Sequence, residues 1–200
     1  MAAARERLFA WRMRRAIHPE RFAAFGERSA IVPPAVIRSP HRIRIGDNVL
    51  IHDRAWLSVV EEFQDQHFEP SLVIGDRCVF GRDLYVSCVG QIEIGHDVLA
   101  SERVLIADTF HGYEDPSTPI SRQPMATPQP VKIGDGAMLS ANVCVLGGVT
   151  IGARTYVGAG AVVTKSVPPN CVVVGNPARI VRWYDHDGGR WIDGAPPGEA

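Results

Sequence analysis

An aliphatic side chain recurs at every sixth position along much of this chain. The longest series lies in the C-terminal half: Ile133, Leu139, Val145, Ile151, Val157 and Val163. Shorter series keep the same spacing earlier: Ile45, Ile51 and Leu57; Ile74, Phe80 and Val86; Ile94, Ala100 and Ile106. This period is neither the two residues of a strand nor the 3.6 residues of a helix. It predicts short strands joined by corners, with every sixth side chain pointing inward.

The residues around each aliphatic position support this interpretation. A small residue often follows it, such as Gly134, Gly152 or Gly158, and glycine relieves crowding where a chain turns. Three hexads would close a triangular coil of about 18 residues, with coils stacked about 4.8 Å apart. The sequence therefore predicts a mainly β protein, a parallel β-helix of roughly five to seven coils. The spacing alone leaves the hand of the helix open.

Other segments depart from the six-residue period. Residues 59–71 form an acidic excursion, and residues 111–130 form a long, proline-rich loop that we expect to protrude. Loops of this length inside a regular solenoid are usually functional or disordered. We therefore divide the chain into an N-terminal helical segment (1–30), a β-helix domain (31–182) and a flexible C-terminal tail (183–200).

The N-terminal segment carries helical patterning. Apolar residues recur at helical spacing over residues 5–17, with arginines between them. Pro19 ends that helix and can open a second short one that stops at Gly26. A helix that caps the main domain is the favoured interpretation, and contact with an anionic membrane or a lipid carrier is the alternative.

Composition excludes several classes of protein. The net charge of -1 provides no basic field for nucleic acid. No apolar run reaches the length of a membrane helix, and the N-terminus lacks the continuous apolar core of a signal peptide. The four cysteines are widely spaced and form no C-x-x-C pair: Cys78, Cys88, Cys144 and Cys171. Reduced thiols in the cytoplasm are the expected state.

The C-terminal hexads carry a specific motif. Residues 131–181 read VKIGDGAMLSANVCVLGGVTIGARTYVGAGAVVTKSVPPNCVVVGNPARIV. This stretch resembles the hexapeptide-repeat acyltransferases, and most of all their sugar O-acetyltransferase branch, which includes galactoside, maltose and exopolysaccharide acetyltransferases. The resemblance covers roughly residues 43–182. It implies a left-handed parallel β-helix, a homotrimer with active sites between subunits, and transfer of an acyl group from acetyl-CoA, or another acyl-CoA, to a sugar hydroxyl.

His111 is the expected catalytic residue. It lies five residues after Ile106, where a coil gives way to the long loop, and the resemblance places the family's catalytic histidine there. A neutral imidazole can take the proton of an attacking hydroxyl and return it to the leaving thiolate. Asp108, Glu114, Asp115 or a backbone carbonyl could orient the ring. The resemblance further implies an oxyanion donor, the backbone N–H of residue 140 or 141.

The acceptor site is expected to involve three residues, Asp83, Tyr85 and Asp108. Asp83 falls where sugar acetyltransferases carry a sugar-contacting polar residue, and a carboxylate there can accept hydrogen bonds from vicinal hydroxyls. Tyr85 and Tyr113 could stack on a sugar ring. The alternatives are an exposed corner residue for Asp83 and ordinary packing for the tyrosines. The identity of the sugar and of its hydroxyl stays open.

The coenzyme site also follows from the resemblance. It implies backbone contacts to the pantetheine arm at Ala141, Ala159 and Gly160, and contacts to the nucleotide at Thr164, Lys165 and Arg179, where positive charge meets phosphate. Two further positions in the set depart from the family pattern. Met138 replaces a tryptophan that usually lies against the coenzyme, and Ser140 replaces a glycine. A different or longer acyl group therefore stays open.

Two other functions compete with this interpretation. A zinc enzyme like the γ-type carbonic anhydrases needs three histidines, but His96 and His111 are far apart and no second histidine follows nearby. A non-catalytic β-helix scaffold is the other alternative. We expect no metal, and we expect direct transfer in a ternary complex because no serine or cysteine sits in an evident nucleophile setting.

Overall fold

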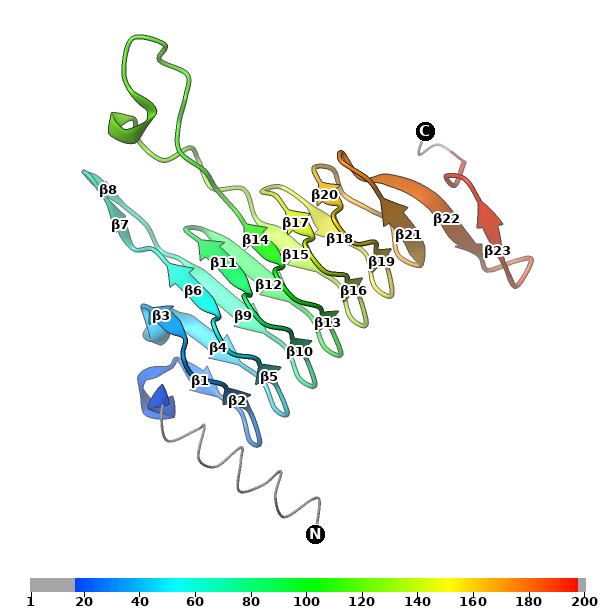
Figure 1. Ribbon diagram of the computed structural model, residues 1–200, viewed down its shortest axis with the longest axis horizontal. Coiled ribbons are helices and arrows are strands. Elements are labelled where there is room, and N and C mark those ends of the chain that lie inside the picture. The colour runs from blue at the N-terminus through cyan, green and yellow to red at the C-terminus, as the bar shows by residue number, and fades with distance from the viewer. Residues whose placement is uncertain (1–16, 198–200) are drawn as a thin grey trace.

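The computed structural model describes residues 17–197, which form a parallel β-helix (Figure 1). Each coil contributes one short strand to each of three sheets, and successive coils pair strand by strand along the stack. The mainly β architecture and the six-residue repeat predicted from the sequence are confirmed. The helix predicted over residues 5–17 lies outside the described residues, apart from Ile17.

The first sheet has six strands in the order β1-β4-β9-β12-β15-β18. Their bounds are β1 Ala24–Phe25, β4 Ile43–Ile45, β9 Ser71–Ile74, β12 Gln91–Ile94, β15 Val131–Ile133 and β18 Thr150–Ile151. Neighbouring strands are parallel, so that Ile94 lies opposite Ile74 on one side and Ile133 on the other. The recurring aliphatic residues thus stack on one another from coil to coil.

The third sheet also has six strands, in the order β3-β6-β11-β14-β17-β20 along the stack. Their bounds are β3 Val36–Arg38, β6 Trp56–Val59, β11 Tyr85–Cys88, β14 Leu105–Ala107, β17 Cys144–Val145 and β20 Val162–Val163. All of their pairings are parallel.

The second sheet is the longest. Its strands are β2 Ala30–Ile31, β5 Leu50–Ile51, β10 Val79–Phe80, β13 Leu99–Ala100, β16 Met138–Leu139, β19 Tyr156–Val157, β21 Cys171–Val174, β22 Arg179–Asp185 and β23 Arg190–Asp193. The last three pair antiparallel. Where the sequence predicted a flexible tail from residue 183, the structure places a strand hairpin, in which the ring of Tyr184 packs edge-on against Trp191 at 5.5 Å.

The chain turns between sheets at three corners in each coil. In the coil that starts at β9, the first corner is residues 75–78, the second is 81–84 and the third is 89–90. Coils approach closely at the first corner: a Cβ added to Gly75 would lie 2.7 Å from the carbonyl carbon and oxygen of Gly95. Real Cβ atoms do not come this close to backbone, so glycine is required there.

The inward side chains form one hydrophobic core along the whole stack. Ile51, Leu57 and Phe80 are completely buried, as the hexad pattern predicts. Corner residues such as Val49 and Leu84 are buried as well. Each coil contributes inward side chains at the same positions, and the stack stays regular over its length (Figure 1).

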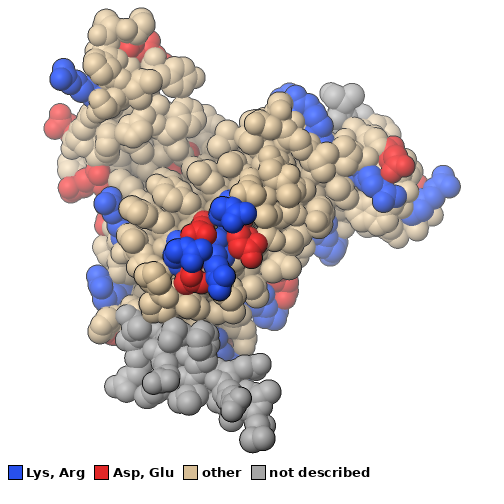
Figure 2. Space-filling model, viewed as in Figure 1, with Lys and Arg blue, Asp and Glu red and all other residues tan. Residues whose placement is uncertain are grey.

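The outer faces of the sheets differ in polarity. On the third sheet, paired strands align a row of half-buried or exposed residues, nearly all apolar: Val36, Trp56, Tyr85, Leu105, Cys144 and Val162. The second sheet carries a similar row: Leu50, Val79, Leu99, Met138, Tyr156 and Val172. The corresponding row on the first sheet includes charges: Arg44, Val73, Glu93, Lys132 and Thr150. Figure 2 shows a face that is largely uncharged around one compact charged cluster.

Two insertions leave the stack at the third corner. The first is an antiparallel hairpin of β7 (Glu62–Phe63) and β8 (Gln66–His67). The second follows β14 and contains the 3-10 turn η3 (Ile120–Arg122); it extends well beyond the coils in Figure 1. Both insertions follow strands of the third sheet, so they emerge from the same edge of the β-helix.

The start of the described chain differs from the prediction of a second short helix between Pro19 and Gly26. The structure has only a 3-10 turn, η1 (Pro19–Arg21), before strand β1. Strand β1 pairs with β4, and β2 pairs with β5, so residues 24–31 already belong to the stack. Pairing with the next coil satisfies these backbone groups better than an isolated helical turn can. Another 3-10 turn, η2 (Pro40–Arg42), leads into β4.

Candidate active site

His111 lies at the base of the long insertion. Its backbone bridges antiparallel to Met125 on the returning strand. Hydrogen bonds flank this bridge on both sides, from the Ala126 N–H to the Phe110 carbonyl at 3.0 Å and from the Gly112 N–H to the Pro124 carbonyl at 2.8 Å. The side chain itself is exposed. The ladder fixes the backbone of His111 and leaves its ring available to a ligand.

The β7–β8 hairpin holds this base in place. The side-chain amide of Gln66 donates to the Met125 carbonyl at 3.2 Å and accepts from the Met125 N–H at 2.7 Å. The ring of Phe63 meets the His111 ring edge-on, with centroids 5.2 Å apart. Sequence reasoning missed both residues. The only available signal was the break in the six-residue period at residues 59–71, which says that an insertion exists but not what it contacts.

None of the three carboxylates considered as orienting groups bonds to the His111 ring within residues 17–197. The side chain of Glu114 accepts from the Tyr113 N–H at 3.0 Å. The side chain of Asp115 accepts from the Ser117 hydroxyl at 2.6 Å and from its N–H. These bonds stabilise turns inside the insertion. The ring contact that the structure records for His111 is with Phe63 instead.

Asp108 is buried and faces the coil rather than the insertion. Its carboxylate accepts from the Val89 N–H at 2.9 Å and from the Gly90 N–H at 2.7 Å. Burial raises the pKa of this carboxyl, while the two backbone donors act in the opposite direction. With 1% of its surface exposed, Asp108 offers little to an acceptor sugar. It satisfies two amides at the third corner of the preceding coil.

Asp83 and Tyr85 lie at and just after the second corner, on another edge from His111. The carboxylate of Asp83 accepts hydrogen bonds from Nε and Nη2 of Arg54, at 2.7 and 2.8 Å. This pairing lowers the pKa of Asp83. Arg54 also bonds to Asp53, which accepts from Arg82 in turn. These four residues form a charged cluster of both signs. Tyr85 points outward from the third sheet, with its ring 6.1 Å from that of Trp56.

Half of the expected coenzyme residues share the second corner. Ser140 and Ala141 follow β16, and Ala159 and Gly160 follow β19 in the next coil. Space is open here, since a Cβ added to Gly160 would meet no atom within 4 Å. Met138 points outward from β16 in the row of the second sheet. The edge thus presents small residues beside an apolar strip, which suits an extended ligand arm.

The backbone N–H groups at this corner differ in whether they already have a hydrogen-bond partner. The Ser140 N–H is used in the ladder, donating to the Val157 carbonyl at 2.9 Å. The Ala141 N–H has no such partner among the described residues. The Ser140 hydroxyl is buried and also has no partner there. Buried polar groups are nearly always satisfied, but this hydroxyl is not accessible from outside the coil. The Ala141 N–H is therefore a donor that this corner offers to a ligand oxygen.

The remaining coenzyme residues lie elsewhere in the single chain. Thr164 and Lys165 follow β20 at the third corner, on the same edge as His111, and both are exposed. Arg179 begins β22 and donates to the Ala178 carbonyl at 2.8 Å. One chain therefore carries His111 and Lys165 on one edge and Ala141 and Gly160 on the next, with the third sheet between them.

The four cysteines are free, and three of them are buried. Burial raises the pKa of the Cys78 thiol to about 11 and that of the Cys88 thiol to about 12. Within residues 17–197, no group of three histidine, cysteine or acidic side chains is placed to hold a metal ion. In the same part of the chain, no helix is long and apolar enough to cross a membrane.

The chain is similar to known acetyltransferases. Residues 130–165 match the family described as bacterial transferase hexapeptide (six repeats). A putative lipopolysaccharide biosynthesis O-acetyl transferase of Escherichia coli, WbbJ, is 32% identical over 164 residues, which cover 79% of this chain and 80% of that protein. A probable acetyltransferase of Mycobacterium tuberculosis, Rv3034c, is 35% identical over 127 residues, but these span only 42% of its length.

A solved structure is similar along most of its length. The hexapeptide-repeat acetyltransferase VCA0836 of Vibrio cholerae, complexed with acetyl coenzyme A, superposes with a TM-score of 0.56 at 28% identity. The match covers 90% of this chain and 84% of that one. The similarity therefore includes the coils that carry the second and third corners described above.

Proposed function

This chain belongs to the hexapeptide-repeat acetyltransferases, and from that premise we propose that it transfers an acetyl group from acetyl-CoA to a hydroxyl of a sugar or glycan precursor. The names of its relatives support the reaction class, and the acetyl coenzyme A bound by VCA0836 supports the donor. The left-handed sense of the β-helix and the homotrimer belong to the same proposal.

One observation carries the proposal: the chemistry is divided between two edges of one chain. His111 and Lys165 occupy the third corner, whereas Ser140 and Ala141 occupy the second. A thioester held at the second corner therefore meets an imidazole only if another copy supplies it. This arrangement is what a site between neighbouring subunits requires.

The polarity of the outer faces supports self-association. The row on the third sheet exposes large apolar side chains, with Val36 43%, Trp56 40% and Tyr85 40% accessible. Contiguous apolar strips of this kind mark interaction surfaces. The first sheet carries charges in the same register and would face solvent. The second sheet carries a similar apolar row, with Leu99 and Tyr156 each 47% accessible. Because the third sheet lies between the corners that carry His111 and Ala141, we assign the third sheet to the contact between three copies around an axis.

In the proposed reaction, His111 acts as general base. Its neutral ring accepts the proton of the sugar hydroxyl as that oxygen attacks the thioester carbonyl carbon. When the tetrahedral intermediate collapses, the same ring returns the proton to the leaving thiolate sulfur. Phe63 restricts the ring from one side, and the ladder through Met125 fixes its backbone. Restricting the ring in this way places the imidazole before the substrate arrives.

The oxyanion is assigned to the second corner. The Ala141 N–H, which has no partner among the described residues, is the donor. Donors that are already positioned stabilise charge on the thioester oxygen without reorganisation. Since the Ser140 N–H is committed to Val157, the role falls to the Ala141 N–H, the other of the two amides that we expected.

A covalent acyl-enzyme is not part of the proposal. With pKa values near 11 and 12, the thiols of Cys78 and Cys88 are poor nucleophiles at neutral pH. Direct transfer in a ternary complex needs only the base and the oxyanion donor. The exposed Thr164 and Lys165 are assigned to the phosphate end of coenzyme A, together with Arg179. Four free cysteines fit a location in the cytoplasm.

The proposal is tested by mixing the purified protein with acetyl-CoA and a thiol reagent, with and without a panel of sugars. We expect thiol release that depends on a sugar and yields an acetylated product by mass spectrometry. Release with no acetylated sugar, or no release with any acceptor, would favour a non-catalytic scaffold. Metal analysis of the same sample separates the zinc alternative.

A further inference from the structure

A pocket of about 290 Å³ opens beside the second corner, one coil before Ser140. Val79 and Leu99 contribute apolar side chains to its lining, and its polar lining comes from His52, Arg82, Ser101 and Glu102. Ser101 ties it to the oxyanion position, because its N–H donates to the Leu139 carbonyl at 2.8 Å. The volume is near the lower end for small-molecule sites and suits a group the size of one sugar ring.

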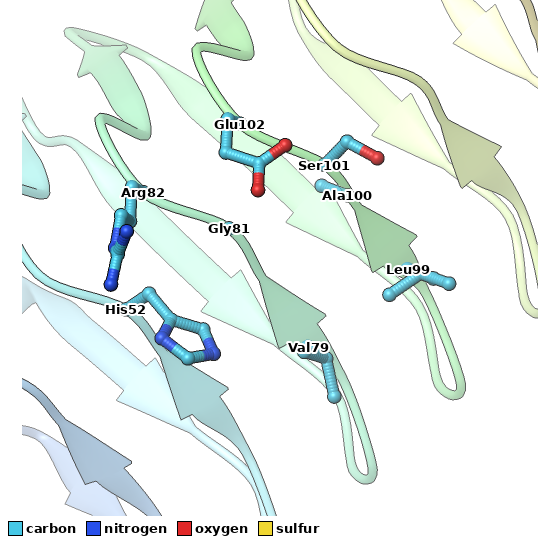
Figure 3. Close-up of a pocket in the computed structure, with 8 residues that line it drawn as sticks. All are labelled: His52, Val79, Gly81, Arg82, Leu99, Ala100, Ser101 and Glu102. Atoms are coloured by element: carbon cyan, nitrogen blue, oxygen red, sulfur yellow. The ribbon is translucent and has the colours of Figure 1, made fainter.

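Figure 3 shows that the polar groups come from three successive coils. The side chain of Arg82 extends toward His52, and the carboxylate of Glu102 lies on the side of Ser101. Glu102 and Arg82 have opposite charges on adjacent coils, yet no ion pair joins them among the described residues. The pocket therefore has a cationic end and an anionic end.

Arg82 is oriented but not saturated. Its Nε donates to Asp53 at 2.9 Å, and its two terminal nitrogens form no hydrogen bond within residues 17–197. Asp53 also pairs with Arg54, so it is shared between two guanidinium groups. A guanidinium held at Nε presents its remaining donors as a fork, which matches the two oxygens of a carboxylate or phosphate.

Glu102 and His52 can serve the rest of a ligand. In the described part of the chain, neither side chain forms a hydrogen bond, and both residues line the pocket. A carboxylate accepts hydrogen bonds from hydroxyl groups, and an imidazole can either accept or donate. Sugar hydroxyls would satisfy these groups without a second charge.

We propose that this pocket binds the acceptor and selects a sugar that bears an acid group, a carboxylate or a phosphate. Arg82 takes the acid group, while Glu102 and His52 take ring hydroxyls. The role of this ligand as acceptor rests on the proposed acetyl transfer, whereas its binding does not. A neutral sugar leaves the fork of Arg82 unpaired and binds more weakly.

The test measures binding by titration calorimetry or ligand-observed NMR without acetyl-CoA. Glucuronate and glucose 1-phosphate represent the two sources of the acid group, and glucose and glucosamine represent neutral and cationic sugars. We expect at least one acid-bearing sugar to bind about tenfold or more tightly than glucose. Arg82→Gln should bring the two within about twofold, and Arg82→Lys should restore part of the difference.

Two variants control for structural effects. Arg77→Gln removes an arginine that pairs with Asp97 at the first corner, on another edge; the preference should persist. Asp53→Asn removes the charge that pairs with Arg82 but keeps an acceptor oxygen for its Nε, so the fork stays in place and the acid-bearing sugar should still bind more tightly than glucose. If either control variant loses the preference as Arg82→Gln does, the effect is structural and the inference is overturned.

Two further outcomes contradict the inference, namely equal binding of all four sugars and tightest binding of glucosamine. Its failure can be told from failure of the proposed function. If acetyl transfer proceeds on neutral sugars and Arg82→Gln leaves KM unchanged, the pocket assignment fails and the reaction stands. If acid-bearing sugars bind through Arg82 but no acetyl group moves, the binding site stands and the reaction fails.

Discussion

At the residue scale, Asp108 separates sequence neighbourhood from structural role. It lies three residues before His111, which made it a candidate both for orienting the ring and for contacting the acceptor. The fold instead turns its carboxylate onto the Val89 and Gly90 amides, in the preceding coil. The position of a residue within its coil decides whether its side chain points inward. A separation of three residues from His111 in the sequence does not decide this.

Replacing Asp108 should therefore affect stability before catalysis. Asp108→Ala leaves two buried N–H groups without acceptors, at a cost of about 2–4 kcal/mol. Asp108→Asn keeps one acceptor oxygen and should cost less. Thermal or chemical unfolding measures both. At a temperature where the variant remains folded, kcat should stay within a few-fold of wild type; a large fall in kcat at unchanged stability would restore the orienting role.

The sequence located His111 but not its neighbours. The hexad period gives the place where a coil ends, so a histidine five residues past Ile106 can be positioned from the pattern. The contacts of Phe63 and Gln66 with the His111 region depend on how two insertions pack, and insertions carry no period. The orphaned hydroxyl of Ser140 was likewise invisible, because burial and hydrogen-bond accounting require coordinates.

At the element scale, the β7–β8 hairpin acts as a support for the base of the long insertion. The side chain of Gln66 forms hydrogen bonds with both the N–H and the carbonyl of Met125, and Met125 pairs with His111 in a β-bridge. Gln66 thus connects the hairpin to the returning strand, which pairs with the segment that carries the proposed base.

Gln66→Ala should lower kcat by about tenfold with little change in the affinity for coenzyme A, because misplacing a catalytic group weakens the reaction more than donor binding. Gln64→Ala is the matched control. Within residues 17–197, the one hydrogen bond of its side chain is a 3.5 Å contact with the Ser121 carbonyl, and kcat should change little. Equal effects from the two substitutions would contradict a specific role for the Met125 clamp.

The hairpin is also anchored at its base by Glu61. Hydrogen bonds from Ser39, and then from Arg42 and His41, lower its pKa to about 2. A carboxyl whose pKa is lower in the folded state than in the unfolded state stabilises the protein at pH values above the unfolded pKa of 4.5. This contribution disappears as the pH falls toward the folded pKa of about 2. Glu61→Gln should therefore lower the melting temperature at neutral pH, and the difference from wild type should shrink between pH 4.5 and pH 2. A difference that is constant with pH would show that charge is not involved.

The regular elements could be predicted because each hexad repeats the same physical constraint, one inward aliphatic side chain and one tight corner. The structure of the C-terminal segment could not be predicted in this way. Residues 183–193 are rich in glycine, aspartate and polar groups, yet Trp183, Tyr184 and Trp191 add strands to the second sheet. Strand addition at a sheet end depends on the free edge of β21, which local composition does not report.

At the scale of the whole molecule, the proposed site is divided between two edges of the chain, and the proposal therefore requires more than one copy. Trp56→Glu places a charge in the apolar row of the third sheet and should reduce the mass measured by light scattering from three chains to one. Activity per chain should fall with it. Thr150→Glu, exposed on the first sheet, should leave the assembly intact. A wild-type protein that is monomeric and active would contradict the shared site.

The measurement that bears most directly on the account is the kinetics of His111→Ala, with coenzyme A affinity measured on the same preparation. If the imidazole of one copy takes the proton while the next copy holds the thioester, kcat should fall by about 100-fold or more, and the dissociation constant for coenzyme A should stay unchanged. A variant that binds coenzyme A poorly but turns over normally at saturation would contradict the assignment of His111 as the base.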